Sequence, residues 1–324
     1  MLLRIFKTSQ PLSWIFIILL LVVLRSVLFF TLFNETHLPE NLSFIGKFCT
    51  WTASIGPLFS HILTLLIIIP SGFFFNKIAQ DANLFKGIHY LLFLFFGVFM
   101  SFSPANLVLS PFILSIPLLL MSLAMILSQT KSKPSLATLF NASFLIGIAA
   151  AFYSPNILLF CILFISLFYL SKVTWRSVFV AFIGVTTPWL FQDVIAFSLN
   201  AHQLYTIQAF SYYLPFADLY HLAPIKTSLA VVFLLFSQLP VYYISSSKSI
   251  IKIRKALFLI LYYIILGLIF SVFVQANFGQ WLNIIVLPIS VVFTLFQLEV
   301  KKWWLGDFTF LLLITCLVMN YLYI

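Results

Sequence analysis

Charged residues are scarce in this chain: only 7% of its 324 residues are Asp, Glu, Lys or Arg, and only seven of those are acidic. Hydrophobic residues make up 63% of the chain, and the mean hydropathy is +1.15. A water-soluble fold has too small an interior to bury so much apolar surface. The composition therefore excludes a soluble protein and predicts a polytopic membrane protein.

Cysteine is also rare, and its spacing indicates no cross-link. Cys49, Cys161 and Cys316 are far apart in the sequence, and two of them lie inside apolar segments. Cysteines in such segments act as small hydrophobic residues. We therefore expect no disulfide framework, no metal site and no cofactor.

Long apolar segments recur along the whole chain. They are unbroken rather than alternating with a period of two, and lipid offers the backbone no hydrogen-bond partner, so the spans are predicted to be helices and not barrel strands. We expect an all-α transmembrane bundle of about eleven helices, forming a single integral-membrane domain over residues 1–324. The predicted spans are 13–33, 55–75, 88–102, 106–128, 136–153, 156–171, 177–192, 227–245, 256–274, 281–297 and 306–324.

Three of these segments form the central part of the chain. A charge-free turn, Tyr153–Asn156, separates 136–153 from 156–171, and a basic turn, Lys172–Arg176, precedes 177–192. Small side chains crowd the first of the three segments. Because small residues let helix backbones approach closely in lipid, we expect 136–153 to be an inner helix of the bundle.

Lys and Arg residues are unevenly divided between the two sides of the predicted bundle. Of the seventeen, only Lys47 and Lys226 fall on one side, and Arg25 lies within the first helix. Because Lys and Arg collect on the cytoplasmic side of short loops, we expect a cytoplasmic N-terminus, a periplasmic C-terminus, and a location in the bacterial inner (plasma) membrane. Contact with anionic headgroups explains the basic run 248–255 without a nucleic-acid partner. The fourteen residues assigned to the cytoplasmic side are Arg4, Lys7, Lys77, Lys86, Lys131, Lys133, Lys172, Arg176, Lys248, Lys252, Arg254, Lys255, Lys301 and Lys302.

Two long loops on the predicted outer side carry most of the ionisable groups outside the basic loops. Four of the seven acidic residues lie in them, and where ionisable groups are so scarce such a cluster indicates a candidate site. Alternatively, the two glutamates end a helix and keep their loop solvated. The loop Asn34–Ser54 carries Glu35, His37, Glu40 and Lys47, and the loop Gln192–Thr227 carries Asp193, His202, Asp218, His221 and Lys226.

Two further polar residues lie within predicted spans. Arg25 is in the outer half of the first helix, where a buried guanidinium is costly and needs a partner or an anion. Alternatively, it snorkels to the interface, or it pairs with Glu35 or Asp193 to hold helices together. His61, in the second span, is expected to make a hydrogen bond between helices.

The central segments also carry a resemblance. LFNASFLIGIAAAFYSPNILLFCILFISLFYL, followed by a basic turn and WRSVFVAFIGVTTPWLF, resembles a family of Phe-rich multi-pass inner-membrane proteins of the Bacteroidetes. The likeness includes the start IFKTSQPLSW and extends over most of the chain. That family implies no function for this chain.

More distantly, the order of parts is similar to that of the C-type glycosyltransferases, membrane enzymes that use polyprenyl-phosphate sugars. The shared features are a cytoplasmic N-terminus, one helix, an outer loop with acidic residues, and then compact helical hairpins. The resemblance implies that a carboxylate in the first outer loop acts on the acceptor, and here only Glu35 or Glu40 matches it. The paired acids common in that loop are absent.

These observations lead to a hypothesis for the outer face. Transfer from a lipid-phosphate sugar needs a base near the acceptor hydroxyl and a cation near the leaving phosphate. The partners would be membrane lipid and a polyprenyl-phosphate sugar. The alternative is a non-catalytic membrane subunit or scaffold of an envelope-assembly or secretion complex, with membrane-protein partners. The catalytic candidates are Glu35, Glu40 and Asp193, and the substrate-binding candidates are Arg25, His37, Asp218, His221 and Lys226.

The charge bias makes the orientation testable. In a chain whose native cysteines are replaced, a single cysteine at Asn41 or Ala209 should react with a membrane-impermeant thiol reagent added from outside. One at Ser132 should react only after the membrane is opened. The reverse pattern would overturn the orientation and every outer-face site that depends on it.

Overall fold

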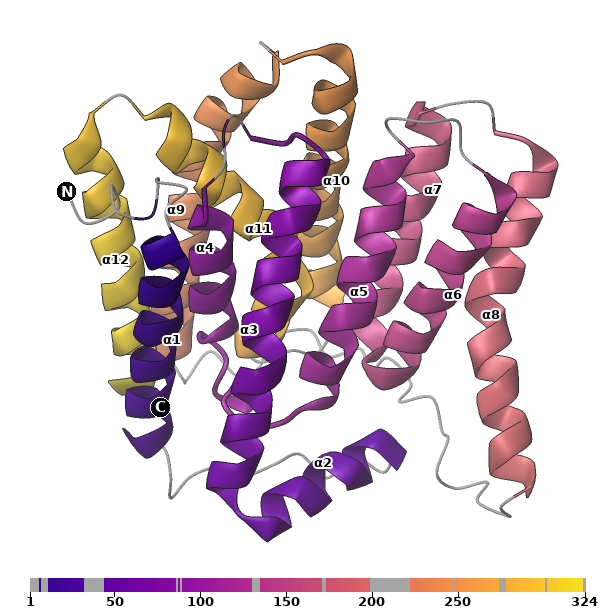
Figure 1. Ribbon diagram of the computed structural model, residues 1–324, viewed down its shortest axis with the longest axis horizontal. Coiled ribbons are helices and arrows are strands. Elements are labelled where there is room, and N and C mark those ends of the chain that lie inside the picture. Colours follow the sequence, from indigo (N-terminus) through magenta and orange to yellow (C-terminus); the bar gives the residue numbers. More distant parts are fainter. Residues whose placement is uncertain are drawn as a thin grey trace.

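The structure is a computed structural model that describes residues 6, 11–31, 44–85, 87, 89–129, 135–170, 173–198, 222–247, 249–273, 278–300 and 302–322. The regular elements in these ranges are twelve α-helices and two short 3₁₀ turns (Figure 1). The helices are α1 (Pro11–Thr31), α2 (Phe44–Ile55), α3 (Pro57–Asp81), α4 (Leu91–Met100), α5 (Pro111–Ser128), α6 (Leu136–Phe152), α7 (Leu158–Leu170), α8 (Trp175–Ser198), α9 (Leu222–Ser247), α10 (Ile251–Phe273), α11 (Phe278–Glu299) and α12 (Trp303–Leu322).

Every helix except α2 corresponds to a predicted span. By length and composition, seven of these helices could cross a membrane, and α4, α6, α7 and the part of α9 from Val231 to Ser247 are shorter apolar stretches. Successive spans run in opposite directions, so that the chain enters α1 at the upper end of the bundle and leaves α12 at the lower end (Figure 1). The prediction of an all-α, multi-pass membrane protein is confirmed.

The helix ends that carry basic residues gather at the upper end of the bundle in Figure 1. They are the last turns of α3 with Lys77, the start of α8 with Arg176, and the start of α10 with Lys252 and Lys255. The structure thus groups these residues on one side, as the charge bias requires. Which side of the membrane this upper end faces stays a prediction.

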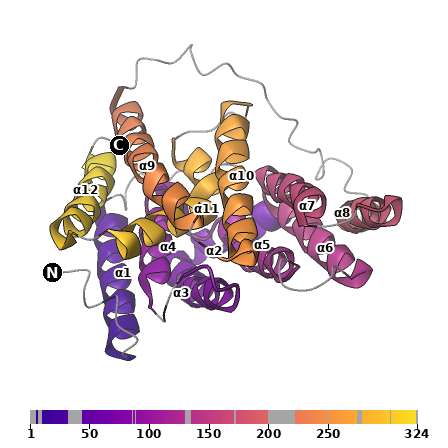
Figure 2. The same ribbon diagram turned by 90° about the horizontal axis from the view of Figure 1, so that it is seen from above.

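Helices α4 and α11 form the centre of the bundle. All ten residues of α4 are buried, and α11 is buried from Leu282 to Gln297. α4 packs against α11 and α3, and α11 also contacts α9 and α10, while α5 to α8 extend the bundle to one side (Figures 1 and 2). A helix that is apolar all round belongs in such an interior position.

α4 is too short to cross a bilayer alone. Its ten residues span about 15 Å at 1.5 Å per residue, half of a hydrocarbon layer about 30 Å thick. The chain continues through a mostly buried irregular segment, residues 101–110, before α5 begins at Pro111. The prediction that a span starts at 106 is therefore wrong, because Pro104 opens a 3₁₀ turn and Ser110 caps the next helix by accepting a hydrogen bond from the Ile113 amide at 3.4 Å.

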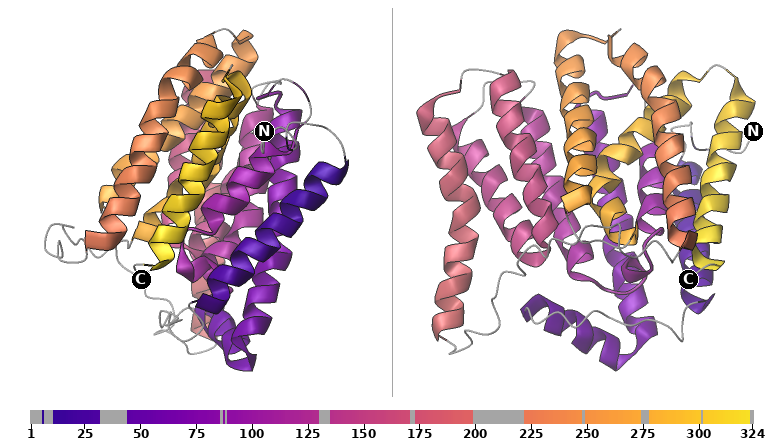
Figure 3. Two further views of the ribbon diagram at one scale, coloured as in Figure 1. Left: turned by 90° about the vertical axis from the view of Figure 1, so that its left-hand side faces the viewer. Right: turned by 180° about the vertical axis from the view of Figure 1, so that it is seen from behind.

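Residues 44–54 were predicted to be loop, and this is wrong. They form most of α2, which lies across the lower end of the bundle and packs on α3 and α5 (Figures 1 and 3). One face exposes Phe48, Trp51 and Ile55, and the other buries Cys49. Burial raises the pKa of the Cys49 thiol to about 12, so that it stays protonated near neutral pH. An amphipathic helix with an outward aromatic face suits the interface of a membrane.

The second predicted outer loop, Gln192–Thr227, is also too long at both ends. α8 continues to Ser198 and α9 begins at Leu222. Asp193 therefore lies in a helix, and Lys226 lies in the first turns of α9. The predicted helices stop short here because they were ended at polar residues, and single polar residues near a helix end do not interrupt the backbone hydrogen bonds.

The small-residue face of the helix α6 is buried, as predicted, while Leu136 and Asn141 on another side of the helix are exposed. The helix lies between α5 and α8 and packs closely on both (Figure 2). A Cβ on Gly147 would meet the Val185 carbonyl oxygen at 2.5 Å and the Pro188 ring at 2.9 Å, and a Cβ on Gly184 would collide with the Ser143 hydroxyl. The α6–α8 contact therefore depends on the absence of side chains at Gly147 and Gly184.

We predict that Gly147→Ala and Gly184→Ala each destabilise the protein by about 1 to 3 kcal/mol, because the added methyl group pushes α6 and α8 apart. The measurement is the melting temperature of the purified protein in detergent. Gly56→Ala is the matched control, since a Cβ there meets no atom within 4 Å. Equal melting of all three variants and the unmodified chain would show that the α6–α8 contact is not tight.

Candidate functional site

Arg25 projects from the lower part of α1 into the interior of the bundle. It is fully buried and is among the largest side chains with no exposure. Its Nη1 donates a hydrogen bond to the Ser101 hydroxyl at 3.3 Å, and its Nη2 donates to the Asn106 carbonyl oxygen. Arg25 therefore does not snorkel to the interface; it binds the irregular segment that follows α4.

The last helix contributes two more donors to the same segment. The Tyr321 hydroxyl donates to the Ser101 carbonyl oxygen at 2.6 Å, and the Asn320 amide donates to the Phe102 carbonyl oxygen at 2.9 Å. These carbonyls lie where α4 ends and have lost their helical partners. α12 thus replaces the hydrogen bonds that a continuous helix would have made.

α3 approaches the segment from another side. His61 Nδ1 lies 2.8 Å from the Leu107 carbonyl oxygen, so this nitrogen carries the proton, and the Leu109 amide donates to the Ser60 hydroxyl at 2.8 Å. The imidazole stacks on Phe29 with ring centroids 4.5 Å apart. His61 makes a hydrogen bond, as expected, but its acceptor is the backbone of the irregular segment 101–110 and not another helix.

A pair of asparagines joins the segment to the central helix. Asn106 Nδ2 donates to Asn283 Oδ1 of α11 at 2.7 Å and to the Met100 carbonyl oxygen at 3.3 Å. Both side chains are buried. Together with the contacts above they form what we call the Arg25 cluster: Arg25, Ser60, His61, Ser101, Asn106, Asn283, Asn320 and Tyr321.

The charge of Arg25 is met by dipoles. Its hydrogen-bond partners among the described residues are a hydroxyl and a carbonyl oxygen, with no carboxylate. The partial negative charge at the end of α4 compensates part of the guanidinium charge. Within the described part of the chain, Arg25 Nε and His61 Nε2 are buried without a hydrogen-bond partner. The cluster thus carries a net positive charge and two unused polar atoms.

Asp193 does not join this cluster. It is an exposed residue near the end of α8, and α8 packs mainly on α6. α1 and α8 lie at opposite sides of the bundle in both Figure 1 and Figure 2. The structure therefore does not bring Arg25 and Asp193 into one cavity, and it excludes the pairing of these two that would have held helices together.

The other predicted site residues lie wholly or partly outside the described structure. Lys226 lies in α9, but its side chain is outside the described part of the structure. The helix ends that precede and follow the segments 32–43 and 199–221 all lie at the lower end of the bundle (Figure 1). The roles of these residues stay predictions. The residues outside the described ranges are Glu35, His37, Glu40, Asp218 and His221.

Sequence reasoning missed most of the uncharged members of the Arg25 cluster. A signal was present, because asparagines such as Asn106, Asn283 and Asn320 are costly inside apolar segments unless their amides are hydrogen-bonded. Only attention to uncharged amides, alongside the ionisable residues, would have found them. Within the described residues no group of three or more His, Cys, Asp or Glu side chains could hold a metal ion.

A family model matches residues 2–324, nearly the whole chain; its description is "Family of unknown function (DUF6427)". The chain belongs to this family. No curated protein and no solved structure matches the chain. The family carries no activity over to the chain, so its function has to be argued from the Arg25 cluster and the elements around it.

We predict that Arg25→Gln destabilises the protein by about 1.5 to 3 kcal/mol, the usual effect of losing hydrogen bonds to a charged group in a buried site. Thermal unfolding in detergent measures it. Arg254→Gln is the control, because Arg254 also donates to backbone carbonyls, at 3.1 and 3.3 Å, but lies at the partly exposed start of α10. Wild-type melting of Arg25→Gln would contradict the structural role of Arg25.

Proposed function

We propose that the protein binds an anionic, polyprenyl-phosphate-linked sugar at the lower end of its bundle and acts there as a glycosyltransferase-like enzyme. In this proposal the lower end faces the periplasm, and the protein lies in the bacterial inner membrane. The observation that carries it is the Arg25 cluster. It contains a buried cation with no carboxylate among its described partners, near the end of the bundle that bears both long predicted outer segments.

The electrostatics of the cluster support an anionic ligand. A guanidinium in a low-dielectric interior raises the local potential, and an ionisable residue at membrane depth is a functional-site candidate by default. Arg25 itself has no exposed surface. It would therefore act as a positioning residue, through the 101–110 segment. Its charge would also attract a phosphate to the surface at the lower end of the bundle.

The amphipathic helix α2 supports a ligand with a lipid tail. It lies across the same end of the bundle (Figure 3). Phe48, Trp51 and Ile55 on one of its faces are exposed. Aromatic residues of this kind reside at the level of lipid headgroups. A polyprenyl chain can follow such a face while its phosphate remains at the polar end.

The proposed chemistry assigns a role to each predicted residue. Glu35 or Glu40 would act as the base on the acceptor hydroxyl, and Lys226 would meet the leaving phosphate. His37, Asp218 and His221 would bind the sugar. Asp193 is on the far side of the bundle from Arg25. It would act as a catalytic residue only with an acceptor that reaches across the lower end of the bundle.

A non-catalytic membrane subunit or scaffold is the second candidate. One observation favours it: the hydrogen bonds of Arg25 to residues 101–110 give this cation a packing role that needs no substrate. A subunit would use the lower end to bind a membrane-protein partner of an envelope-assembly or secretion complex.

Binding and release of the sugar separate the two candidates. The purified protein should melt at a higher temperature with polyprenyl phosphate than with the corresponding uncharged polyprenol. With a polyprenyl-phosphate sugar as donor and water in place of the acceptor, free sugar and polyprenyl phosphate should form. This release should disappear in Glu35→Gln or in Glu40→Gln, while the phosphate-dependent stabilisation remains.

Two results would contradict the enzyme. Equal stabilisation by polyprenyl phosphate and by polyprenol would show that the protein has no site for the anionic phosphate. Stabilisation by the phosphate alone, with no sugar released by the unmodified chain from any of several donors, would favour the subunit.

A further inference from the structure

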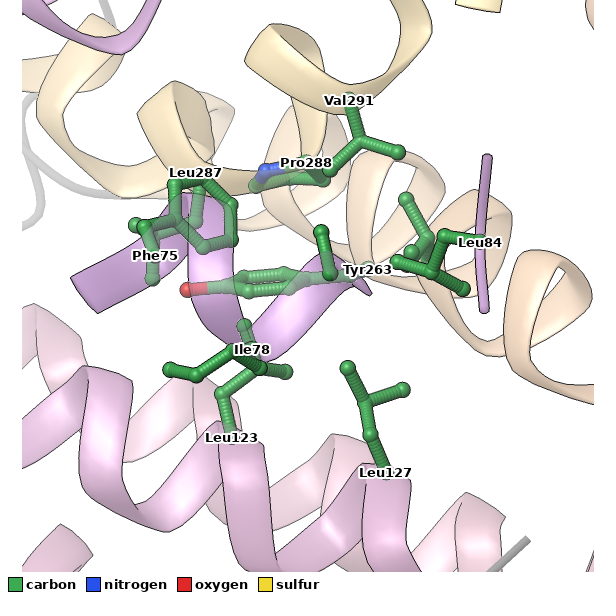
Figure 4. A pocket seen from close by; sticks show the side chains of 11 residues that line it. Phe75, Ile78, Leu84, Leu123, Leu127, Tyr263, Leu287, Pro288 and Val291 are labelled. Atoms are coloured by element: carbon green, nitrogen blue, oxygen red, sulfur yellow. The ribbon is translucent and has the colours of Figure 1, made fainter. Parts of the chain in front are cut away.

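The bundle offers a different apolar surface at each end. In the upper half, a small apolar cleft lies between α3, α5, α10 and α11, and the ring of Tyr263 lies across it (Figure 4). The free space in this cleft is that of about one water molecule, so it holds no lipid chain. At the lower end, by contrast, α2 exposes large apolar side chains outside the candidate membrane spans.

The helix α2 has two distinct faces. Phe48, Trp51 and Ile55 follow one another at spacings of three and four residues, so they share one side of the helix, and they are 44–58% exposed. The ring centroids of Phe48 and Trp51 lie 5.9 Å apart. Cys49 and Thr52 are buried on another side. We call Phe48, Trp51 and Ile55 the α2 apolar face.

The exposed apolar surface continues beyond the end of α2. Gly56 separates the two helices with an extended backbone (φ 164°), and Pro57 begins α3. In α3, Leu58, Ile62 and Leu66 recur every four residues and are 47–65% exposed. α3 is one of the seven helices that could cross a membrane, and the exposed apolar side of such a span faces acyl chains. The α2 apolar face therefore adjoins, along the chain, a surface that lipid covers.

The length and position of α2 fit the interface of a membrane. Its twelve residues extend about 18 Å, too little to cross a hydrocarbon layer about 30 Å thick. It lies instead across the lower end of the bundle (Figures 1 and 3). Ser54, beside Ile55, is exposed as well, so a polar hydroxyl borders the apolar face. Aromatic side chains next to polar ones are typical of helices that lie between headgroups and acyl chains.

The start of α3 joins α2 to the Arg25 cluster. Ser60 and His61 follow Gly56 by four and five residues, and both bind the 101–110 segment: the Ser60 hydroxyl accepts from the Leu109 amide, and His61 Nδ1 donates to the Leu107 carbonyl oxygen. At 1.5 Å per residue, His61 lies about 8 Å from Gly56 along α3. The level of α2 in a membrane therefore sets the level of the cluster.

We propose that the α2 apolar face binds the phospholipid leaflet at the lower end of the bundle, with its side chains at the boundary between headgroups and acyl chains. An interfacial helix of this kind lies about 5–10 Å into the leaflet. The Arg25 cluster is then held about 8 Å deeper, at the outer edge of the hydrocarbon. Ordinary phospholipid is sufficient for this contact, so it holds whether or not the protein binds a polyprenyl phosphate.

Spin labels on the full-length protein measure the depth of α2. The protein is placed in vesicles of phosphatidylglycerol and phosphatidylethanolamine without any polyprenyl lipid. In a chain whose three native cysteines are replaced by alanine, a nitroxide is attached at Ile55→Cys or, as the aqueous reference, at Lys302→Cys in the exposed turn before α12. Power saturation compares contact with oxygen, which concentrates among acyl chains, and with a water-soluble nickel complex. The label at position 55 should favour oxygen and lie about 5–10 Å below the phosphates.

A double variant tests the aromatic side chains themselves. Phe48→Ser together with Trp51→Ser should remove most of the depth of the label at position 55, because α2 loses the rings that hold it in the leaflet. Both side chains are exposed, so these changes do not disturb the core. Phe308→Ser is the matched control. Phe308 is 56% exposed but lies on α12, so its replacement should leave the depth of the label unchanged.

Three results would overturn the proposal. If the nickel complex reaches the label at position 55 as readily as the label at position 302, the α2 apolar face lies in water. If neither oxygen nor nickel reaches it, protein covers the face, such as a second copy of the chain. An unchanged depth in the double serine variant would show that Phe48 and Trp51 do not hold α2 in the leaflet. Failure of the protein to bind polyprenyl phosphate would leave all these measurements unchanged, because the vesicles contain none.

Discussion

The carbonyl groups of residues 101–110 impose the constraint on which the rest of the bundle depends. α4 stops after ten residues, and its last carbonyls lie among apolar helices where no water can bind them. Hydrocarbon tolerates irregular backbone only where protein groups satisfy it. Arg25, His61, Asn320 and Tyr321 supply those groups from α1, α3 and α12. The first and last spans must therefore meet at the same buried segment.

The two ends of the bundle differ in the groups that they carry. The lower end holds a buried polar cluster, an amphipathic helix on its surface, and the helix ends that border segments 32–43 and 199–221. The upper end holds the basic helix ends and an apolar cleft.

The sequence anticipated parts of the candidate site and missed others for a specific reason. Arg25 and His61 stood out because each is a polar residue alone in an apolar run, and both are buried polar residues of the cluster. Arg25 binds the Ser101 hydroxyl and the Asn106 carbonyl oxygen, 76 and 81 residues away, and His61 binds the Leu107 carbonyl oxygen, 46 residues away. No local pattern reveals such pairings. The amphipathic helix α2 escaped notice because twelve residues are too few to span a membrane, and the segment was assigned to a loop.

The sequence by itself determined that the protein is a multi-pass helical membrane protein, where most of its apolar helices lie, and that Lys77, Arg176, Lys252 and Lys255 share one end. These properties follow from hydropathy and from the position of charges along the chain, which are local quantities. The tertiary structure alone decided that Arg25 binds the 101–110 backbone, that Asp193 lies far from it, and that a cleft opens beside Tyr263. The physical reason is that an orphaned carbonyl or a gap between helices is created by packing, and packing joins residues whose separation in the chain carries no signal.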